Sequence, residues 1–428
     1  MLLIYSHTIT ARLNYTCSFI FKELMGVDFA ITSDRDEFIN ANTVKINYSS
    51  NAVAGIEIHI PSNGLLFEED IKVQTIKCFE QDNYKAFFKT NSPGFSFDIF
   101  AATFYLLTRY EEYLPHTKDM YGRYDHENSL AFKEGFLQLP LINIWVNDFA
   151  TAIKKKFSIF NFQFSIFNFI PTYDIDIAWS YKHKGIGRNI GSFLQSPTTE
   201  RIKVLFGLQK DPFDAYQWLD DLHQQYKLTP VYFFLLAQKN GLYDKNILPN
   251  KTAFKALIKY HSDKYKTGIH PSWQSGDNFL LLKKEKKILE SLGHLPVDKS
   301  RQHYIRFHLP SGYRRLLEAG ITNDYSMGYG SSNGFRASIA SSFYWYDLEH
   351  EKQTSLRIHP FCFMEANSFY EQKFSAQQAY QELVHYYTVC KKVNGTLITI
   401  WHNNFLGTAK EFEGWKEVYE KFIAQVQQ

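Results

Sequence analysis

Short apolar runs bounded by polar residues recur along the first 155 residues, a pattern typical of an α/β unit. Each run is compatible with a short strand, and a helical stretch is predicted through residues 19–24. The strands predicted in this part lie at residues 2–5, 43–48 and 55–60.

The apolar residues of FSFDIFAATFYLLTRYEEYL, residues 95–114, recur at helical spacing. This spacing predicts a helix buried in the core. The charged residues Arg109, Glu111 and Glu112 are expected at its solvent-exposed end.

Strand-like and helix-like segments alternate from residue 171 onward, which predicts parallel strands joined by right-handed crossovers. About seven strands, most followed by a helix, favour a complete or incomplete TIM-like barrel over an open sheet. The site of such a barrel lies at the carboxyl ends of its strands. The predicted strands are 170–175, 229–236, 267–270, 303–307, 321–327, 355–363 and 396–401. The predicted helices are 214–226, 251–260, 280–292, 312–319, 377–393 and 412–426.

Between these two parts lies a phenylalanine-rich segment, residues 157–169, in which FSIFNF is repeated after one glutamine. Its alternation predicts one long strand or a two-strand continuation. We interpret this segment as the boundary between the two domains and expect it to contribute little to the chemistry of the protein. The predicted organisation is therefore an α/β domain at 1–155, a linker at 156–169 and a barrel at 170–428.

Composition supports two folded domains and excludes some partners. The 428 residues are 45% hydrophobic and 21% charged, and 47 Lys plus Arg against 44 Asp plus Glu give a net charge of +3. This small excess does not indicate binding to nucleic acid or to an anionic membrane.

Cysteine usage and hydropathy favour a cytoplasmic location. The four cysteines are far apart and form no CxxC pair, which fits a reducing compartment. Polar residues such as Arg12 interrupt the first apolar stretch, so no secretion signal is predicted. No run approaches the roughly twenty apolar residues of a membrane-spanning helix.

Polar residues follow four of the predicted strands, where a core strand has little reason to end in charge. Two carboxylates and three imidazoles are therefore expected to converge. The four segments are TYDID (172–176), GIHPSW (268–273), SRQHYIRF (300–307) and TIWHNN (399–404).

Each residue also has an ordinary structural interpretation. Asp174 and Asp176 could cap a helix or form a turn, although two carboxylates at one strand end repel unless a cation lies between them. His270 could be a hydrogen-bonded loop histidine, and His303 could be a core or surface histidine. For His402 a structural role and a functional role are equally compatible with the sequence. The coincidence of four such strand ends is what favours a site.

Carboxylate and imidazole ligands with one open position are typical of a catalytic divalent ion such as zinc. Such an ion lowers the pKa of a bound water and polarises a carbonyl. A neighbouring carboxylate can act as base and a histidine can protonate the leaving group. The set predicts hydrolysis of an amide or ester.

At these motifs, residues 165–428 resemble the NodB-homology polysaccharide deacetylases, carbohydrate esterase family four, which fold as distorted (β/α)7 barrels. The family's first motif, Thr-Phe-Asp-Asp-Gly, corresponds to TYDID. The resemblance implies that Asp174 is the base. Ile175 occupies the second position, so the metal-binding role passes to Asp176, as in divergent branches with an Asp-x-Asp form.

The remaining motifs match less evenly. His270 corresponds to the first histidine of the second motif, but Gln274 and Ser275 stand where the second metal-binding histidine is expected. His303 from the next strand could supply the missing ligand, or the ion could be held by fewer protein groups.

The resemblance also implies an arginine that orients the base and a histidine that acts as acid. SRQHYIRFHLP makes Arg301 the first candidate for the arginine and GFRA makes Arg336 the second, although either could form a structural salt bridge. LITIWH resembles the last motif and makes His402 the acid.

Over nearly the whole chain, the sequence also resembles a bacterial subgroup of polysaccharide deacetylase proteins that carries an uncharacterised amino-terminal domain. The motifs of this resemblance are FDIFAATFYLLTRYEEYLP, GFL, TYDID, HPS, RQHY, MGY and GFRA. The predicted function is metal-dependent removal of acetyl groups from an N-acetylated sugar or glycan precursor. Two alternatives stay open, namely a catalytically silent glycan-binding barrel, suggested by the missing second-motif histidine, and a hydrolase of a cyclic or other non-sugar amide.

Overall fold

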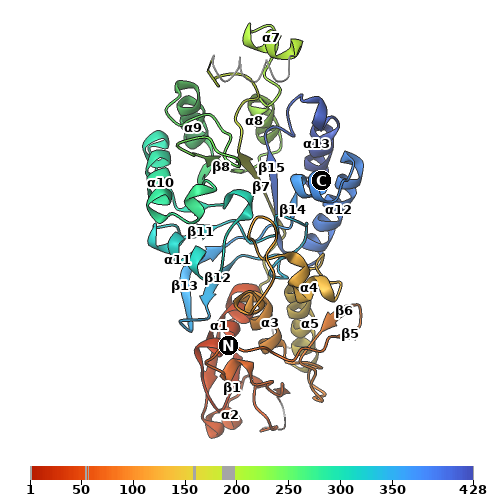
Figure 1. The fold of residues 1–428 in the computed structure, drawn as a ribbon. Helices are drawn as coiled ribbons and strands as arrows, with labels where there is room; N and C mark the ends of the chain where they lie inside the picture. The colour runs from red at the N-terminus through yellow and green to blue at the C-terminus, as the bar shows by residue number, and fades with distance from the viewer. Residues whose placement is uncertain (1, 54, 56, 158–160, 186–197, 428) are drawn as a thin grey trace.

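A four-stranded sheet and a nine-stranded sheet organise the two parts of the chain in the computed structural model, which describes residues 2–53, 55, 57–157, 161–185 and 198–427 (Figure 1). The smaller sheet lies at one end of the molecule and the larger one at the other. The arrangement is α/β, as the alternating pattern predicts.

The amino-terminal sheet is parallel and has the strand order β2-β1-β3-β4. The apolar run LLIY makes β1 a buried central strand. The strands are β1 (Leu2–Tyr5), β2 (Phe29–Thr32), β3 (Val44–Asn47) and β4 (Ile58–His59), with a hairpin of β5 (Phe79–Gln81) and β6 (Tyr84–Ala86) beside them. The helices are α1 (Ala11–Cys17), continued by a π-helical segment at Ser18–Leu24, α2 (Arg35–Asn40), α3 (Ile99–Leu107), α4 (Leu130–Lys133) and α5 (Leu141–Lys156).

The helix predicted over 95–114 is shorter, and its charged end is not exposed. Asp98 caps α3 by accepting a hydrogen bond from the backbone of Ala101. The helix ends before Arg109, whose φ of 55° lies in the left-handed region. Arg109, Glu111 and Glu112 are all buried. The expected solvent exposure is therefore wrong, because these charges pair with one another inside the protein.

The larger sheet has the order β12-β13-β11-β10-β9-β8-β7-β15-β14. Its strands pair in parallel except for β12 with β13, so the sheet is mixed. Within the described ranges no ladder joins β14 to the opposite edge. The strands are β7 (Asn168–Ile175), β8 (Val231–Leu235), β9 (Lys266–His270), β10 (Lys299–Ser300), β11 (Asn323–Asp324), β12 (Phe343–Asp347), β13 (Lys352–Ile358), β14 (Phe363–Met364) and β15 (Thr396–His402).

Helices flank this sheet, with α9 and α10 on one side of β7, β8 and β15 and α12 and α13 on the other (Figure 1). They bury one face each, as their apolar spacing predicts. The helices of this part are α7 (Thr199–Leu205), α8 (Tyr216–Gln225), α9 (Thr252–Lys264), α10 (Phe279–Gly293), α11 (Ser311–Glu318), α12 (Ala376–Lys392) and α13 (Trp415–Val426).

Three predicted strands of this part differ in the structure, and the one predicted at 355–363 is divided between β13 and β14. The segment 321–327 contributes only the short strand β11. The strand predicted at 303–307 is wrong: β10 ends at Ser300, and His303–Ile305 form a 3₁₀ turn. Tyr304 and Ile305 have φ values of 58° and 55°, which no strand residue adopts.

The phenylalanine-rich segment is not a strand over residues 161–167, and β7 begins only at Asn168. Residues 158–160 of this prediction lie outside the described ranges. Phe162, Phe164 and Phe167 are partly buried against the core, and the backbone N–H of Gln163 donates to the carbonyl oxygen of Met25 at 2.9 Å. These contacts take the place of strand pairing.

Among the described residues, none of the helices combines the length and apolar character needed to cross a bilayer.

Candidate metal-binding and catalytic site

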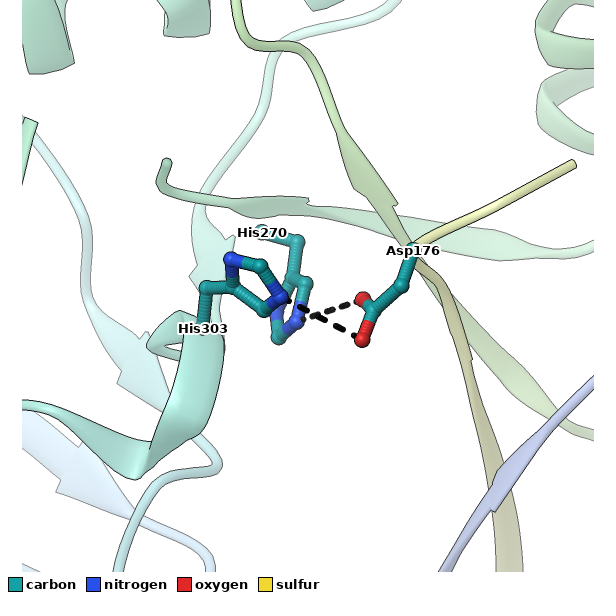
Figure 2. A group of neighbouring side chains, drawn as sticks. All are labelled: Asp176, His270 and His303. Carbon is teal, nitrogen blue, oxygen red and sulfur yellow. Dashed lines mark ion pairs between the residues drawn. The ribbon is translucent and has the colours of Figure 1, made fainter. Parts of the chain in front are cut away.

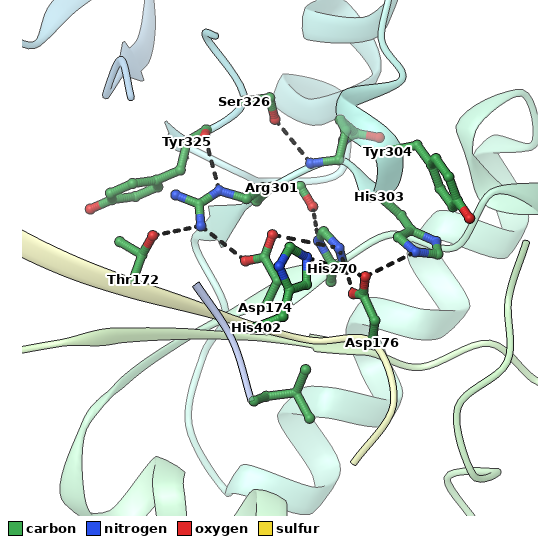
Figure 3. A network of polar contacts seen from close by, with 12 residues as sticks. Thr172, Asp174, Asp176, His270, Arg301, His303, Tyr304, Tyr325, Ser326 and His402 are labelled. Atoms are coloured by element: carbon green, nitrogen blue, oxygen red, sulfur yellow. Dashed lines mark hydrogen bonds and ion pairs between the residues drawn. The ribbon is translucent and has the colours of Figure 1, made fainter. Parts of the chain in front are cut away.

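The carboxyl ends of four neighbouring strands bring six of the seven predicted site residues together (Figure 3). The strands are β7, β9, β10 and β15, which are adjacent or nearly so in the sheet. Figure 3 shows the side chains facing one central space. The six residues are Asp174, Asp176, His270, Arg301, His303 and His402.

Asp176, His270 and His303 form a compact group in which one ligand atom of each lies within 4.8 Å of the others (Figure 2). Nε2 of His270 lies 3.0 Å from Oδ1 of Asp176, and Nε2 of His303 lies 3.3 Å from Oδ2. Both histidines are buried, whereas 23% of the Asp176 side chain is exposed. A carboxylate and two imidazoles, open on one side, are ligands that zinc uses in catalytic sites.

The Nδ1 atoms of the two histidines form hydrogen bonds with other groups of the protein. Nδ1 of His270 lies 2.6 Å from the carbonyl oxygen of Arg301, and Nδ1 of His303 lies 3.1 Å from Oδ1 of Asp244. Because these oxygens only accept hydrogen bonds, each Nδ1 carries a hydrogen. In a neutral imidazole this leaves the lone pair on Nε2, which faces Asp176.

Lone pairs that face a carboxylate repel it unless a proton or a metal ion lies between them. Oδ1 of Asp176 accepts no well-oriented hydrogen bond from the described residues. Burial lowers the pKa of His303, but Asp176 and Asp244 outweigh it and raise that pKa to about 9. Burial alone would raise the pKa of Asp176, yet His303 and His270 hold it well below its usual value. The group therefore favours positive charge at its centre.

Asp174 lies beside this group and is held by a buried arginine. Being two residues apart, Asp174 and Asp176 project to the same side of the chain. Nη1 of Arg301 donates to Oδ1 of Asp174 at 2.9 Å and to Oγ1 of Thr172 at 2.6 Å, and Nε donates to the carbonyl oxygen of Tyr325. The other Asp174 oxygen lies 3.8 Å from Nε2 of His270. Arg301 thus orients the carboxylate and leaves one oxygen toward the centre.

His402 approaches from the end of β15 and is held by a second carboxylate. Its Nδ1 and its backbone nitrogen both lie 2.6 Å from Oε1 of Glu365, and its Nε2 lies 3.5 Å from Oδ2 of Asp176. Burial lowers the pKa of His402, but Glu365 and Asp176 raise it well above its usual value. The imidazole therefore tends to carry a proton that it can donate.

The second candidate arginine, Arg336, lies outside this group. Its Nε and Nη2 donate to the two carboxylate oxygens of Glu112 at 2.9 and 2.6 Å, and its Nη1 donates to the carbonyl oxygen of Gly328. These contacts occupy the guanidinium in a salt bridge between the two parts of the chain. The arginine that contacts Asp174 is Arg301.

Sequence reasoning missed Asp244 and Glu365, which hold two of the histidines. Glu365 follows the apolar run FCFM, so it fits the same strand-end pattern as the other candidates. Asp244 lies in the connection between β8 and α9, where no pattern distinguishes it from other polar loop residues.

A cavity of about 440 Å³ opens over the group. Its volume suits one or a few rings of a small ligand. Besides the site residues Asp174, Asp176, His270, His303 and His402, its lining includes Tyr121, Arg123, Tyr304, Tyr370 and Phe405.

Comparisons with known proteins match the two parts of the chain separately. Residues 2–158 match the model of a family of unknown function, DUF7033. No curated protein matches the sequence.

The solved structures that this chain is similar to include three polysaccharide deacetylases by name. A protein of Mycobacterium smegmatis assigned as a polysaccharide deacetylase is 10% identical, with a TM-score of 0.40, over 61% of this chain and 84% of that chain. The polysaccharide deacetylase of Bacillus cereus is 10% identical, with a TM-score of 0.30, over 61% and 88%. A probable polysaccharide deacetylase of Pseudomonas aeruginosa is 12% identical, with a TM-score of 0.38, over 60% and 84%.

Proposed function

We propose that the protein is a metal-dependent hydrolase that removes acetyl groups from N-acetylated sugars or a glycan precursor. The observation that carries this proposal is the convergence of Nε2 atoms from His270 and His303 on the Asp176 carboxylate, with both Nδ1 atoms already occupied. That arrangement calls for a proton or a metal ion between the groups, and it offers the ligand atoms that a divalent ion requires.

The donor set fits such an ion. Asp176, His270 and His303 would hold it, and the oxygens of Arg301 and Asp244 fix the two imidazole rings from behind. When bound, a divalent ion supplies Lewis acidity that lowers the pKa of water and polarises an amide carbonyl. Zinc is our choice because one carboxylate and two histidines form one of its catalytic ligand sets.

The remaining residues supply proton transfer. Asp174 accepts the proton of the attacking water, and Arg301 holds its other oxygen so that the carboxylate stays oriented. His402, held by Glu365, donates a proton to the departing amine. Base and acid thus stand on neighbouring strands, β7 and β15, whose register pairs Asp174 with His402.

An N-acetylated sugar is the substrate class that the motif resemblance favours, and the aromatic side chains of the cavity suit a ring-shaped ligand. With this function we propose that seven neighbouring strands of the larger sheet, in the order β11-β10-β9-β8-β7-β15-β14, form an open version of the distorted (β/α)7 barrel. We also propose that the boundary lies at residues 156–169 and that the enzyme acts in the cytoplasm.

Replacement of Asp174 by Asn tests the assignment of the base. Asn keeps the shape of the side chain but cannot take up a proton, so we expect kcat for acetate release from N-acetylglucosamine oligomers to fall by a factor of about 10² to 10⁴. Metal content, measured by mass spectrometry of the purified protein, is expected to remain as in the wild type. Treatment with a chelator should abolish acetate release, and added zinc or cobalt should restore it.

The exposed Asp263 on α9 provides a matched control, because Asp263→Asn makes the same replacement of a carboxylate by an amide at a residue that does not line the cavity. Acetate release by Asp174→Asn at the wild-type rate would contradict the assignment. A protein that holds no divalent ion and stays inactive with zinc or cobalt would favour the silent glycan-binding barrel. Hydrolysis of cyclic amides but not of N-acetyl sugars would favour the third alternative.

A further inference from the structure

The amino-terminal part of the chain contributes side chains to the cavity of the carboxyl-terminal part. Tyr121 and Arg123 line the cavity together with the predicted metal group. They lie in the connection between α3 and α4, well before β7 begins at Asn168. The family of unknown function that matches residues 2–158 includes this connection. The site is therefore incomplete without the amino-terminal part.

Tyr121 belongs to a cluster of aromatic rings, of which Tyr121 and Tyr304 line the cavity. Its ring centroid lies 5.2 Å from that of Tyr304 and 6.1 Å from those of Tyr243 and Trp273. Tyr243 and Trp273 stack at 4.0 Å, and Tyr304 meets both edge-on. None of these four rings is fully buried. We call the four residues Tyr121, Tyr243, Trp273 and Tyr304 the aromatic wall.

The aromatic wall adjoins the predicted metal group directly. Tyr304 follows His303 in the chain, and the centroids of their rings are 4.6 Å apart. Trp273 lies three residues after His270, and its backbone N–H donates to Oδ1 of Asp244, the carboxylate that also holds His303. If the reacting group of a ligand lies at Asp176, the part of the ligand next to that group therefore lies against these rings.

Arg123 holds the turn that carries His303 and Tyr304. Its Nη1 donates to the carbonyl oxygen of Tyr304 at 2.8 Å, its Nε donates to Oδ2 of Asp119, and its guanidinium lies 4.7 Å from the ring centroid of Tyr121. The turn has left-handed φ values at Tyr304 and Ile305. Such a conformation in residues other than glycine persists only where its surroundings hold it.

Gly330 provides the space for this arginine. A Cβ atom at Gly330 would lie 1.9 Å from Nη1 of Arg123 and 2.9 Å from the carbonyl oxygen of Tyr304. Three segments therefore meet tightly here: the connection before α4, the turn after β10 and the loop after β11. Their close packing makes Arg123 a structural link between the two parts of the chain.

We propose that the aromatic wall is a binding subsite for a sugar ring next to the one that is deacetylated, with Tyr121 contacting the ligand and Arg123 acting as a positioning residue. The inference rests on the proposed function, because it takes the ligand to be an N-acetylated sugar oligomer. Half-buried aromatic rings offer a large apolar contact area at low entropic cost, which suits the apolar face of a sugar. The amino-terminal part then has a defined role, to extend recognition beyond the reacting residue.

The test compares Tyr121→Ala, Tyr121→Phe and Arg123→Ala with the wild-type full chain. The probe is the trimer of β-1,4-linked N-acetylglucosamine, and its Kd is measured by titration calorimetry on the zinc-loaded protein. We expect Tyr121→Ala to raise Kd about tenfold, and to raise KM for acetate release more than it lowers kcat. Tyr121→Phe keeps the ring and should restore Kd to within about threefold of the wild type.

Arg123→Ala tests the positioning role through a different readout. Release of the Tyr304 carbonyl should loosen the turn that carries His303, so we expect the Kd for zinc, measured by competition with a chromogenic chelator, to rise as well. Tyr260→Ala, on the exposed surface of α9, is the control for loss of a tyrosine elsewhere. Circular dichroism checks that each variant is folded, and the Tyr121 variants keep the test valid if Arg123→Ala does not fold.

Failure of this inference can be told apart from failure of the proposed function. If the wild type releases acetate but a folded Tyr121→Ala binds and hydrolyses the trimer as well as the wild type does, only the subsite is overturned. If the wild type binds the trimer through Tyr121 without releasing acetate, the subsite holds and the hydrolytic function is overturned. A wild type that neither binds nor hydrolyses the trimer overturns both.

Discussion

The hydrogen-bond partner of each Nδ1 atom sets the chemistry of the three site histidines. His270 uses a backbone carbonyl, whereas His303 and His402 use the carboxylates of Asp244 and Glu365. A carboxylate partner raises the basicity of the imidazole and fixes its ring more strongly than a carbonyl does. Among single residues, Asp244 therefore supports the proposed metal site by fixing the ring of His303.

Loss of the Asp244 carboxylate should weaken metal binding without removing a ligand. In Asp244→Ala, Nδ1 of His303 loses its acceptor and the ring is free to turn, so we expect the affinity for zinc to fall about 10- to 100-fold. Competition with a chelator of known affinity measures the change. Asp263→Ala, at an exposed position of α9, should bind zinc like the wild type. Equal affinities in the two variants would exclude a supporting role for Asp244.

The strand-end pattern identified Asp174, Asp176, His270 and His402 because a charge that ends an apolar strand is conspicuous in the sequence. It could not show which of them touch. His303 was singled out on a strand that does not exist, and it joins the group because the turn after β10 folds it back over the sheet. Asp244, in a loop, is recognisable only from its contacts.

At the scale of elements, α10 fixes the loop that follows β9. The side chain of Glu285 on α10 accepts hydrogen bonds from the backbone and the hydroxyl of Ser272, two residues after His270. Burial raises the pKa of Glu285 to about 7, although the contacts with Ser272 oppose the change. The helix thus holds the His270 loop through a carboxyl group that is protonated at mildly acidic pH.

This raised pKa predicts a pH dependence of stability. Between about pH 4.5 and pH 7 the folded state binds the Glu285 proton and the unfolded state does not, so the free energy of unfolding falls as the pH rises through this window. The contribution amounts to about 3 kcal/mol at most. Glu285→Gln removes this pH dependence. The free energy of unfolding of the variant, relative to that of the wild type, should therefore be higher at pH 8 than at pH 5, as measured by urea unfolding at both pH values. A difference that is the same at both pH values would contradict the prediction.

Elements in which apolar residues recur at regular spacing were predicted closely, whereas the ends of strands and the turns were not. The centres of β7, β8, β9 and β15 and of the long helices follow from local spacing alone. The segment 161–167 alternates like a strand but finds no partner strand, and its phenylalanines pack on the core instead. Strand pairing depends on neighbours distant in sequence, which a local pattern does not contain.

At the scale of the whole molecule, buried charges join the two parts of the chain. Glu112 lies between Arg109 of its own part and Arg336 of the other, and all three are buried. Burial would raise the pKa of Glu112, but Arg336 and Arg109 lower it to about 2. Arg12 and Glu351 form a second pair across the same interface.

Removal of Glu112 should destabilise the molecule strongly. Glu112→Ala leaves Arg109 and Arg336 buried without their shared partner, and we expect a loss of about 3–5 kcal/mol in the free energy of unfolding. Urea unfolding at neutral pH measures it. Glu349, which pairs with Arg314 at the surface, is the control, and Glu349→Ala should cost less than about 1 kcal/mol. Similar losses in the two variants would show that the interface does not depend on this charge cluster.

Local periodicity and polar residues at strand ends were enough to predict the α/β class, most central strands and helices, and the residue types available at the site. The three-dimensional arrangement was needed to show that Arg301 rather than Arg336 holds Asp174, that His303 lies beside Asp176 and His270, and that Tyr121 and Arg123 reach the cavity. These contacts join segments far apart in the chain. They depend on how the strands order themselves and on how turns redirect the backbone, and no local pattern of apolar and polar residues specifies either.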